Sequence, residues 1–248
     1  MALKSFIPNF VTLLNLFCGS IAVLFAVNNL FVAAAVFVFL GIFFDFFDGL
    51  LARKLNAQSD IGLQLDSLAD MVTSGLVPGI IMFKLISLSV DSSAFITSST
   101  EWNSLLHLGD FKLAPIALIG LLVTLGSGYR LAKFNVDEEQ QSYFKGLPTP
   151  ANALLIMSLP LIMEFQNNDL INSIILNVWF LIPLAIVSCY ILNAPVKLFA
   201  LKFKDWSFKN NAIRYIFILL CIVLLVVLQF AAIPLIILLY ILMSLFSK

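Results

Sequence analysis

The chain has 248 residues, of which 61% are hydrophobic and 11% are charged, with 14 basic and 14 acidic side chains. Its mean hydropathy of +1.05 excludes an ordinary soluble domain and indicates an integral membrane protein. No basic tract could follow a phosphate backbone, so we expect no nucleic-acid partner. Cys18, Cys189 and Cys221 lie in apolar runs without metal-ligand spacing, which indicates small buried residues and neither a disulfide framework nor a zinc site.

Eight apolar stretches approach or exceed the length that a helix needs to cross a hydrocarbon core about 30 Å thick. The alternating pattern of a membrane β-barrel is absent, so the predicted fold class is an all-α, polytopic membrane protein with about eight transmembrane helices. We expect one membrane domain over residues 1–248, with a catalytic core at about 7–195 and two additional C-terminal helices at about 214–247. The predicted spans are roughly 10–28, 30–51, 62–88, 113–133, 149–165, 172–195, 214–230 and 232–247.

Basic residues are distributed unevenly about these spans. With the N-terminus placed in the cytoplasm, 12 of the 14 Lys and Arg residues fall on the cytoplasmic side, and only Lys84 and Lys112 fall near the outside. This asymmetry predicts that both termini and the active site face the cytoplasm, in what we expect to be a bacterial plasma (inner) membrane. The one long outer loop, at about 89–112, is rich in Ser and Thr and shows no pattern typical of a chemical site.

Four carboxylates stand inside or at the ends of two predicted membrane helices, where each costs at least about 2.5–3.5 kcal/mol. Asp45 and Asp48 are spaced i,i+3, which puts them on one helix face. Asp66 and Asp70 are spaced i,i+4 and share a face of the next helix, so the two faces can converge. Oxygen ligands without nearby His or Cys favour hard divalent ions, so we expect two ions, Mg²⁺ or Mn²⁺, with Ca²⁺ also allowed.

Small residues accompany these acids. Gly49 and Gly62 permit a bulky group to approach the helix backbone, and Ala52 keeps the same wall low. Arg53 offers a fork of donors suited to a phosphate or a carboxylate. An isolated Asp in a membrane helix is often a packing residue, but four acids at these spacings with interleaved glycines favour a functional site. The acids fall toward the cytoplasmic end of the first of the two helices, so the site is expected to open inward.

The chain resembles the CDP-alcohol phosphatidyltransferase family at every position of the run Asp45-x2-Asp48-Gly49-x2-Ala52-Arg53-x8-Gly62-x3-Asp66-x3-Asp70. Within that family, three further segments are similar to the integral-membrane branch of phosphatidylserine synthases; they are Ile7–Gly19, Asp66–Pro78 and Arg130–Pro150. The other class of serine-transferring enzyme, related to phospholipase D, needs paired histidine motifs that the single His107 cannot supply.

The resemblance implies displacement of CMP from CDP-diacylglycerol by L-serine, in a helical membrane fold with a polar cavity open to the cytoplasm. It implies that Asp45, Asp48 and Asp66 are chiefly metal ligands. Asp70 is expected in the same metal cage and is implied as the base that takes the proton from the attacking hydroxyl. The cytidine nucleotide pocket implied by the resemblance is lined by Gly49, Ala52, Arg53 and Gly62.

The remaining candidate residues are less specific. If L-serine is the acceptor, we expect Arg130 or Lys133, together with Asn135, to bind it, with the turn at Gly146 shaping the other side of the pocket. The alternative for both cations is an ordinary positive-inside anchor. The polar pair Asn9 and Thr12 either lines the nucleotide site or packs between helices.

Two other functions stay open at this point. A related phosphatidyltransferase could use another alcohol, such as glycerol phosphate or inositol phosphate. From a different class, a divalent-cation transporter would explain buried acids, although it predicts a site near mid-membrane between repeats, and no repeat is visible. The expected partners are CDP-diacylglycerol, L-serine and membrane lipid, and a homodimer stays open as the assembly.

Overall fold

The computed structural model describes residues 2–92, 114–136, 144–166, 168–198 and 208–246. The predicted outer loop, with His107 and Lys112, lies almost wholly outside these residues. The described chain is helical apart from two strands of two residues each, β1 (Phe144–Lys145) and β2 (Lys197–Leu198). They pair antiparallel, with Phe144 opposite Leu198. An all-helical membrane fold is therefore confirmed.

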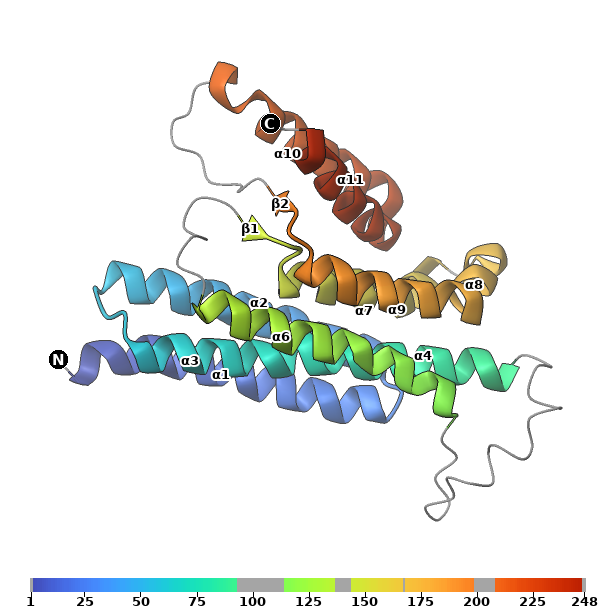
Figure 1. Cartoon of the computed structure of the whole chain (residues 1–248), viewed down its shortest axis with the longest axis horizontal. Helices are drawn as coiled ribbons and strands as arrows, with labels where there is room; N and C mark the ends of the chain where they lie inside the picture. The colour runs from blue at the N-terminus through green and yellow to red at the C-terminus, as the bar shows by residue number, and fades with distance from the viewer. Residues whose placement is uncertain (1, 93–113, 137–143, 167, 199–207, 247–248) are drawn as a thin grey trace, which may run out of the picture.

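The N-terminal half forms a layer of long helices that run nearly parallel (Figure 1). Small buried residues such as Ala22, Ala26 and Ala34 let the first two helices pack closely as a hairpin. The third membrane segment continues as two α-helices joined by a π-helical turn. In chain order the elements are α1 (Ala2–Val27), α2 (Phe31–Lys54), α3 (Asp60–Asp70), η1 (Met71–Leu76) and α4 (Val77–Ser92).

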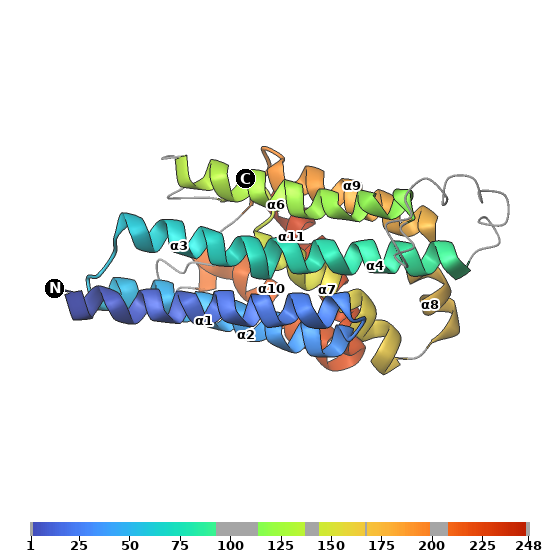
Figure 2. The same ribbon diagram turned by 90° about the horizontal axis from the view of Figure 1, so that it is seen from below.

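The C-terminal half adds a second group of helices and an outer pair. Figure 2 shows the α3–α4 segment between the α1–α2 hairpin and α6, whereas Figure 1 shows α10 and α11 as a tilted pair beyond α7 and α9. The elements are η3 (Pro115–Leu121), α6 (Leu122–Val136), α7 (Thr149–Gln166), α8 (Asp169–Ile175), α9 (Val178–Asn193), α10 (Phe208–Leu228), η5 (Gln229–Ala231) and α11 (Ala232–Phe246).

Fewer separate stretches have the length and hydropathy of a membrane span than the eight expected, partly because one stretch contains both of the last two predicted spans. Among the described residues, five stretches are long and apolar enough to cross a membrane, or six if the bent pair α8 and α9 forms one span. The predicted span at 149–165 corresponds to α7, which is not among them and carries polar Asn152, Glu164 and Gln166. The five stretches are Phe6–Val27, Phe31–Lys54, Asp60–Val90, Pro115–Val136 and Arg214–Leu245.

The two last predicted spans lie in one apolar stretch that reverses direction. The ring centroids of Phe217 and Tyr240 are 5.8 Å apart, although 23 residues of straight helix would span about 35 Å. The reversal lies at η5, where Gln229 has a φ of 49°. The helices α10 and α11 therefore form a hairpin, and α11 packs through Ile237 against Leu147 and Leu198.

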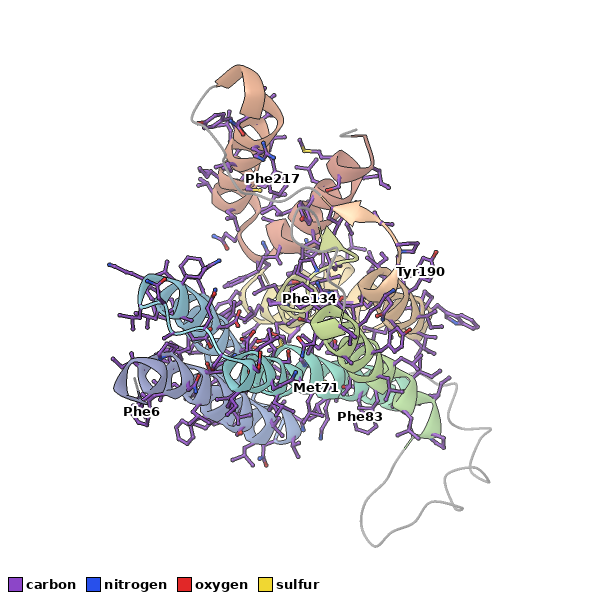
Figure 3. The ribbon with its side chains drawn as sticks, turned by 60° about the vertical axis from the view of Figure 1, so that its left-hand side comes forward. Phe6, Met71, Phe83, Phe134, Tyr190 and Phe217 are labelled. Atoms are coloured by element: carbon purple, nitrogen blue, oxygen red, sulfur yellow. The ribbon has the colours of Figure 1, made fainter. Side chains whose placement is uncertain are left out.

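The main core lies where α2, α4, α7 and α9 meet. Val38, Ile81, Ile156 and Leu181, one from each helix, are fully buried there. Figure 3 shows Phe6 and Tyr190 at opposite outer edges of the bundle, with Met71 between them. Many large apolar side chains are exposed around the outside, as expected for a helical bundle in lipid.

Candidate active site

Three of the four predicted acids converge. Asp45 and Asp48 project from α2 and Asp66 projects from α3, and one carboxylate oxygen of each lies within 4.8 Å of the others. Asp48 is buried, and Asp45 and Asp66 are half-buried. The tight turn after α2 positions the two helices: the amide of Ala57 donates to the Ala52 carbonyl. The side chain of Ser59 then accepts a bond from the Gly62 amide and caps α3.

This cluster has the chemistry of a divalent-cation site. Asp48 Oδ2 and Asp66 Oδ1 are buried and have no hydrogen-bond partner among the described residues. Unsatisfied buried carboxylate oxygens are costly, and like charges this close repel one another. A hard divalent cation would remove both penalties, because it takes oxygen ligands and supplies opposite charge. The residues present therefore fit a metal ion, and Asp45, Asp48 and Asp66 could hold it.

The fourth acid, Asp70, lies outside this group of three. Its carboxylate is only 8% exposed, and its Oδ1 accepts a hydrogen bond of 3.2 Å from the side-chain amide of Asn15 on α1. Asp70 is also the last residue of α3 before the π-helical turn. Its role as a metal ligand or as a base stays a prediction.

A cavity of about 480 Å³ opens beside the acids, between α1, α2 and α3. Its wall includes both acids Asp48 and Asp66 and all six residues expected around the nucleotide, namely Asn9, Thr12, Gly49, Ala52, Arg53 and Gly62. Lining residues that the sequence analysis did not single out are Pro8, Ala57, Gln58, Ser59, Asp60 and Leu63. Half of these residues, Ala57, Gln58 and Ser59, belong to the connection between α2 and α3, whose path the sequence does not reveal.

The two glycines of the cavity differ in what surrounds them. A Cβ added at Gly49 would meet nothing nearer than a terminal nitrogen of Arg53, at 4.0 Å. A Cβ added at Gly62 would lie 3.1 Å from Asn9 Oδ1 and 3.2 Å from Ser59 Oγ. Gly62 therefore allows α3 to approach α1, whereas the space at Gly49 belongs to the cavity.

The residues expected to bind the acceptor lie in three different settings. Arg130 is buried, and its Nε has no hydrogen-bond partner among the residues that the structure describes. Its guanidinium interacts electrostatically with Asp70 and with Tyr240 of α11. Lys133 is exposed at the end of α6. Asn135 accepts a bond of 3.1 Å from Ser67 Oγ, which ties the end of α6 to α3.

Gly146 is required by the backbone conformation of the turn that follows β1. Its φ is +78°, and an added Cβ would overlap the carbonyl oxygen of Leu192. Its amide donates to the Val196 carbonyl at 2.9 Å. These contacts explain the glycine without a ligand, and its predicted part in the acceptor pocket stays a prediction.

Asn15 and Thr73 were assigned no role from the sequence. Asn15 lies in the middle of α1, with Thr73 in the π-helical turn, and both are fully buried. Thr73 Oγ1 donates to the side-chain oxygen Oδ1 of Asn15 at 2.8 Å, and it lies 3.2 Å from the main-chain carbonyl oxygen of Asn15. The sequence did show a polar amide, Asn15, inside an apolar helix, which is a signal for a functional residue. Its partners could not be predicted, because they depend on how the helices pack.

The model of the CDP-alcohol phosphatidyltransferase family matches residues 5–191. The chain belongs to this family. Its members are enzymes that use a CDP-alcohol donor and an alcohol acceptor, which agrees with the resemblance noted in the sequence. The hairpin of α10 and α11 lies beyond the matched residues.

Several curated relatives carry more specific names. The chain is 31% identical over 170 residues to a CDP-diacylglycerol-serine O-phosphatidyltransferase of Bacillus subtilis, covering 68% of this chain and 81% of the relative. It is 29% identical over 169 residues to a protein of the same name from Methanocaldococcus jannaschii, covering 68% and 66%. It is 31% identical over 155 residues to the archaetidylserine synthase of Methanothermobacter thermautotrophicus, covering 61% and 56%.

Proposed function

We propose that this phosphatidyltransferase transfers the phosphatidyl group from CDP-diacylglycerol to L-serine and releases CMP. The observation that carries the proposal is the cavity between α1, α2 and α3, which joins two of the clustered acids to Arg53 and the open space at Gly49. The names of the relatives support serine as the acceptor, since two are called CDP-diacylglycerol-serine O-phosphatidyltransferase and the third is called archaetidylserine synthase.

The cavity suits the nucleotide part of the donor. Its volume of about 480 Å³ lies in the range of small-molecule pockets. The Arg53 guanidinium on its wall can bond a phosphate through two donors. The acyl chains of the donor would stay in the bilayer, because the cavity lies at the end of membrane-spanning helices.

Asp45, Asp48 and Asp66 would hold the divalent ions, for which Mg²⁺ and Mn²⁺ are the first candidates. When bound, such ions supply positive charge that neutralises the pyrophosphate and stabilises the departing CMP oxygen. The protein's own part is to orient the donor through Arg53 and to keep the acids in place on two helices.

The transfer forms one phosphorus-oxygen bond and breaks another. The serine hydroxyl oxygen attacks the phosphorus that carries the diacylglycerol, the bond from that phosphorus to CMP breaks, and CMP leaves. The hydroxyl proton passes to Asp70, which we assign as the base because it lies beside the cluster without belonging to it. Asn15 holds Asp70 Oδ1, so Oδ2 is the oxygen that remains for the proton.

The acceptor pocket is proposed at the end of α6. Serine offers a carboxylate, and the buried Arg130 has an Nε donor without a partner in the described structure. Asn135 is tied to Ser67, which lies one helical turn before Asp70 on α3. Lys133 and Gly146 belong to the proposal as the outer cation and the turn of the same pocket. A serine bound here would present its hydroxyl near the proposed base.

The membrane placement is also a proposal. Arg53 and Lys54 lie in the last turn of α2 and Lys133 lies in the last turn of α6. These two helix ends are on the same side of the bundle as the N-terminus (Figure 1), where the cavity also opens. The positive-inside rule then puts this end, with both termini and the site, in the cytoplasm of what we propose to be a bacterial plasma membrane.

The experiment is an assay of CMP release from CDP-diacylglycerol by the purified protein, with L-serine, glycerol 3-phosphate, inositol and inositol phosphate in parallel. Release with serine alone is expected. If another alcohol releases CMP and serine does not, serine is the wrong acceptor, but the proposed phosphatidyltransferase activity stands. If none of the four releases CMP while divalent ions cross a vesicle membrane through the protein, the transporter alternative takes its place.

A further inference from the structure

A chain of hydrogen bonds crosses from the π-helical turn through α1 to the proposed base. Thr73 Oγ1 donates to Asn15 Oδ1 at 2.8 Å, and Asn15 Nδ2 donates to Asp70 Oδ1 at 3.2 Å. Asn15 and Thr73 have no exposed surface, and Asp70 is 8% exposed. The amide of Asn15 therefore has both of its ends engaged in a place that water does not reach.

Two glycines make this row of hydrogen bonds possible, because they let the backbones of α1 and α2 approach Thr73 closely. A Cβ at Gly41 would lie 2.6 Å from Thr73 Cγ2 and 2.8 Å from Asn15 Oδ1. A Cβ at Gly19 would overlap Thr73 Oγ1. Neither distance is possible for real atoms, so α1 and α2 close around Thr73 only because both positions are glycine.

The π-helical turn supplies the third constraint. It carries Thr73, and its Gly75 carbonyl accepts a bond of 3.1 Å from Thr124 Oγ1 on α6. A π-turn leaves main-chain groups less well paired than an α-helix, and such turns are frequent at functional sites. The bond from Thr124 joins the turn to α6, and the contacts of Thr73 join it to α1, so the turn is held from both sides.

The direction of these hydrogen bonds determines which end of the Asn15 amide faces Asp70. A primary amide can be turned end for end at little cost unless its partners distinguish the oxygen from the nitrogen. The ionised Asp70 carboxylate makes that distinction, because it can only accept and so takes the NH₂ group of Asn15. The Thr73 hydroxyl donates to Oδ1 at the other end and holds the amide in place. Without the hydroxyl, the buried Oδ1 of Asn15 would lose this donor, and the amide would be free to rotate away from its bond to Asp70.

We propose that Asn15, oriented by Thr73, is a positioning residue that holds Asp70 in the rotamer needed for proton transfer. The inference deepens the proposed function and rests on it. Asp70 stands next to three other carboxylates that a metal ion would gather. The bond from Asn15 keeps Asp70 Oδ1 on the α1 side, so that the carboxylate stays available to the acceptor and does not turn into the cluster.

The test compares two replacements of Thr73. Thr73→Val keeps the shape and removes the hydroxyl, whereas Thr73→Ser keeps the hydroxyl. We expect Thr73→Val to lower kcat about 10- to 100-fold, the size of loss that follows misplacement of a reacting group. KM for both substrates and the affinity for CDP-diacylglycerol in detergent should change less than about twofold. Thr73→Ser should restore kcat. Ser89→Ala is the control, since it removes a buried hydroxyl that donates to Ile86 at 2.8 Å on the same membrane segment.

A second measurement does not depend on activity. Thermal unfolding midpoints are compared for Asn15→Leu, Asp70→Asn and the double variant, with the pair Asn28→Ala and Asp70→Asn as control. Because Asn15 and Asp70 are in contact, the shifts of the unfolding midpoint should be non-additive when both are replaced. Asn28 has no hydrogen bond to Asp70 in the described structure, so the shifts of that control pair should be additive. Normal kcat in Thr73→Val, failure of Thr73→Ser to restore it, or additive shifts for Asn15 and Asp70 would each overturn the inference. If the wild type releases no CMP with any acceptor, the proposed function fails, and the unfolding cycle still decides whether Asn15 positions Asp70.

Discussion

Arg53 folds back along α2 and donates a hydrogen bond from Nε to the main-chain oxygen of Gly49, at 3.0 Å. The bond joins a cation in the last helical turn to a backbone carbonyl, which stabilises the helix end. It also directs the guanidinium along the cavity wall, and its terminal nitrogen is the nearest group to the open side of Gly49. The two residues thus form one surface for the nucleotide.

Gly49→Ala should separate stability from binding. Alanine is better than glycine in a helix interior by about 0.5–1 kcal/mol, and among the described residues no atom lies closer than 4.0 Å to the added methyl group. We therefore expect an unchanged or higher free energy of unfolding and a weaker affinity for CDP-diacylglycerol, because the methyl group occupies cavity space. Gly126→Ala is the contrasting variant, since its Cβ would lie 2.9 Å from Cys189 Sγ and should destabilise the protein. Undiminished donor affinity in Gly49→Ala would contradict this role for the cavity.

Arg53→Gln should weaken donor binding about 10- to 100-fold, which corresponds to loss of a charge-assisted bond of about 1.5–3 kcal/mol. Lys54→Gln is the matched control, because Lys54 is an exposed cation on the same helix end that does not line the cavity. The dissociation constant for CDP-diacylglycerol, measured in detergent at fixed salt, distinguishes the two. Equal effects of both substitutions would mean that only the net charge of this end matters.

Divalent ions should stabilise the protein through the cluster of acids. Added Mn²⁺ is expected to raise the unfolding midpoint of the wild type, because an ion that binds only the folded state stabilises it. Asp48→Asn and Asp66→Asn should lose most of this rise, since each removes a carboxylate of the cluster. Asp169→Asn, at an exposed acid on α8, should keep it. Full turnover after exhaustive chelation and metal-free dialysis would refute the metal site.

Arg130→Met should raise the KM for serine sharply, about 10-fold or more, while CDP-diacylglycerol binding stays nearly unchanged. Lys133→Met should have a smaller effect, because Lys133 is exposed and water screens its charge. Lys84→Met provides a control on α4, away from the site. Serine dependence that is the same in all three variants would show that the acceptor pocket lies elsewhere.

The spacing of the acids predicted their common faces because both pairs lie in unbroken α-helix. Asp45 and Asp48 are inside α2, and Asp66 and Asp70 are inside α3, so the helical period applied directly. The period does not say how far one helix is displaced from the next. For that reason the sequence predicted a cage of four acids, whereas the structure groups three and bonds Asp70 to Asn15.

The features that could not be predicted from the sequence depend on breaks in the helices and on how the helices pack. Hydropathy does not register the bend of 57° between α8 and α9. The reversal near Gln229 was anticipated, because the predicted spans 214–230 and 232–247 are separated at that point. The π-helical turn has the residues Met-Val-Thr-Ser-Gly-Leu, which would also suit an α-helix. The roles of Asn15 and Thr73 follow from that turn and from the close approach of α1, so neither could be derived from a single chain segment.

The most direct test of the central claim is the product formed from labelled L-serine and CDP-diacylglycerol by the purified protein. The account predicts labelled phosphatidylserine and CMP in equal amounts from the wild type. It predicts that Asp70→Asn forms little of either while it still binds CDP-diacylglycerol. Serine that stays unlinked to lipid while another alcohol is phosphatidylated, or an Asp70→Asn variant with near-normal turnover, would contradict it.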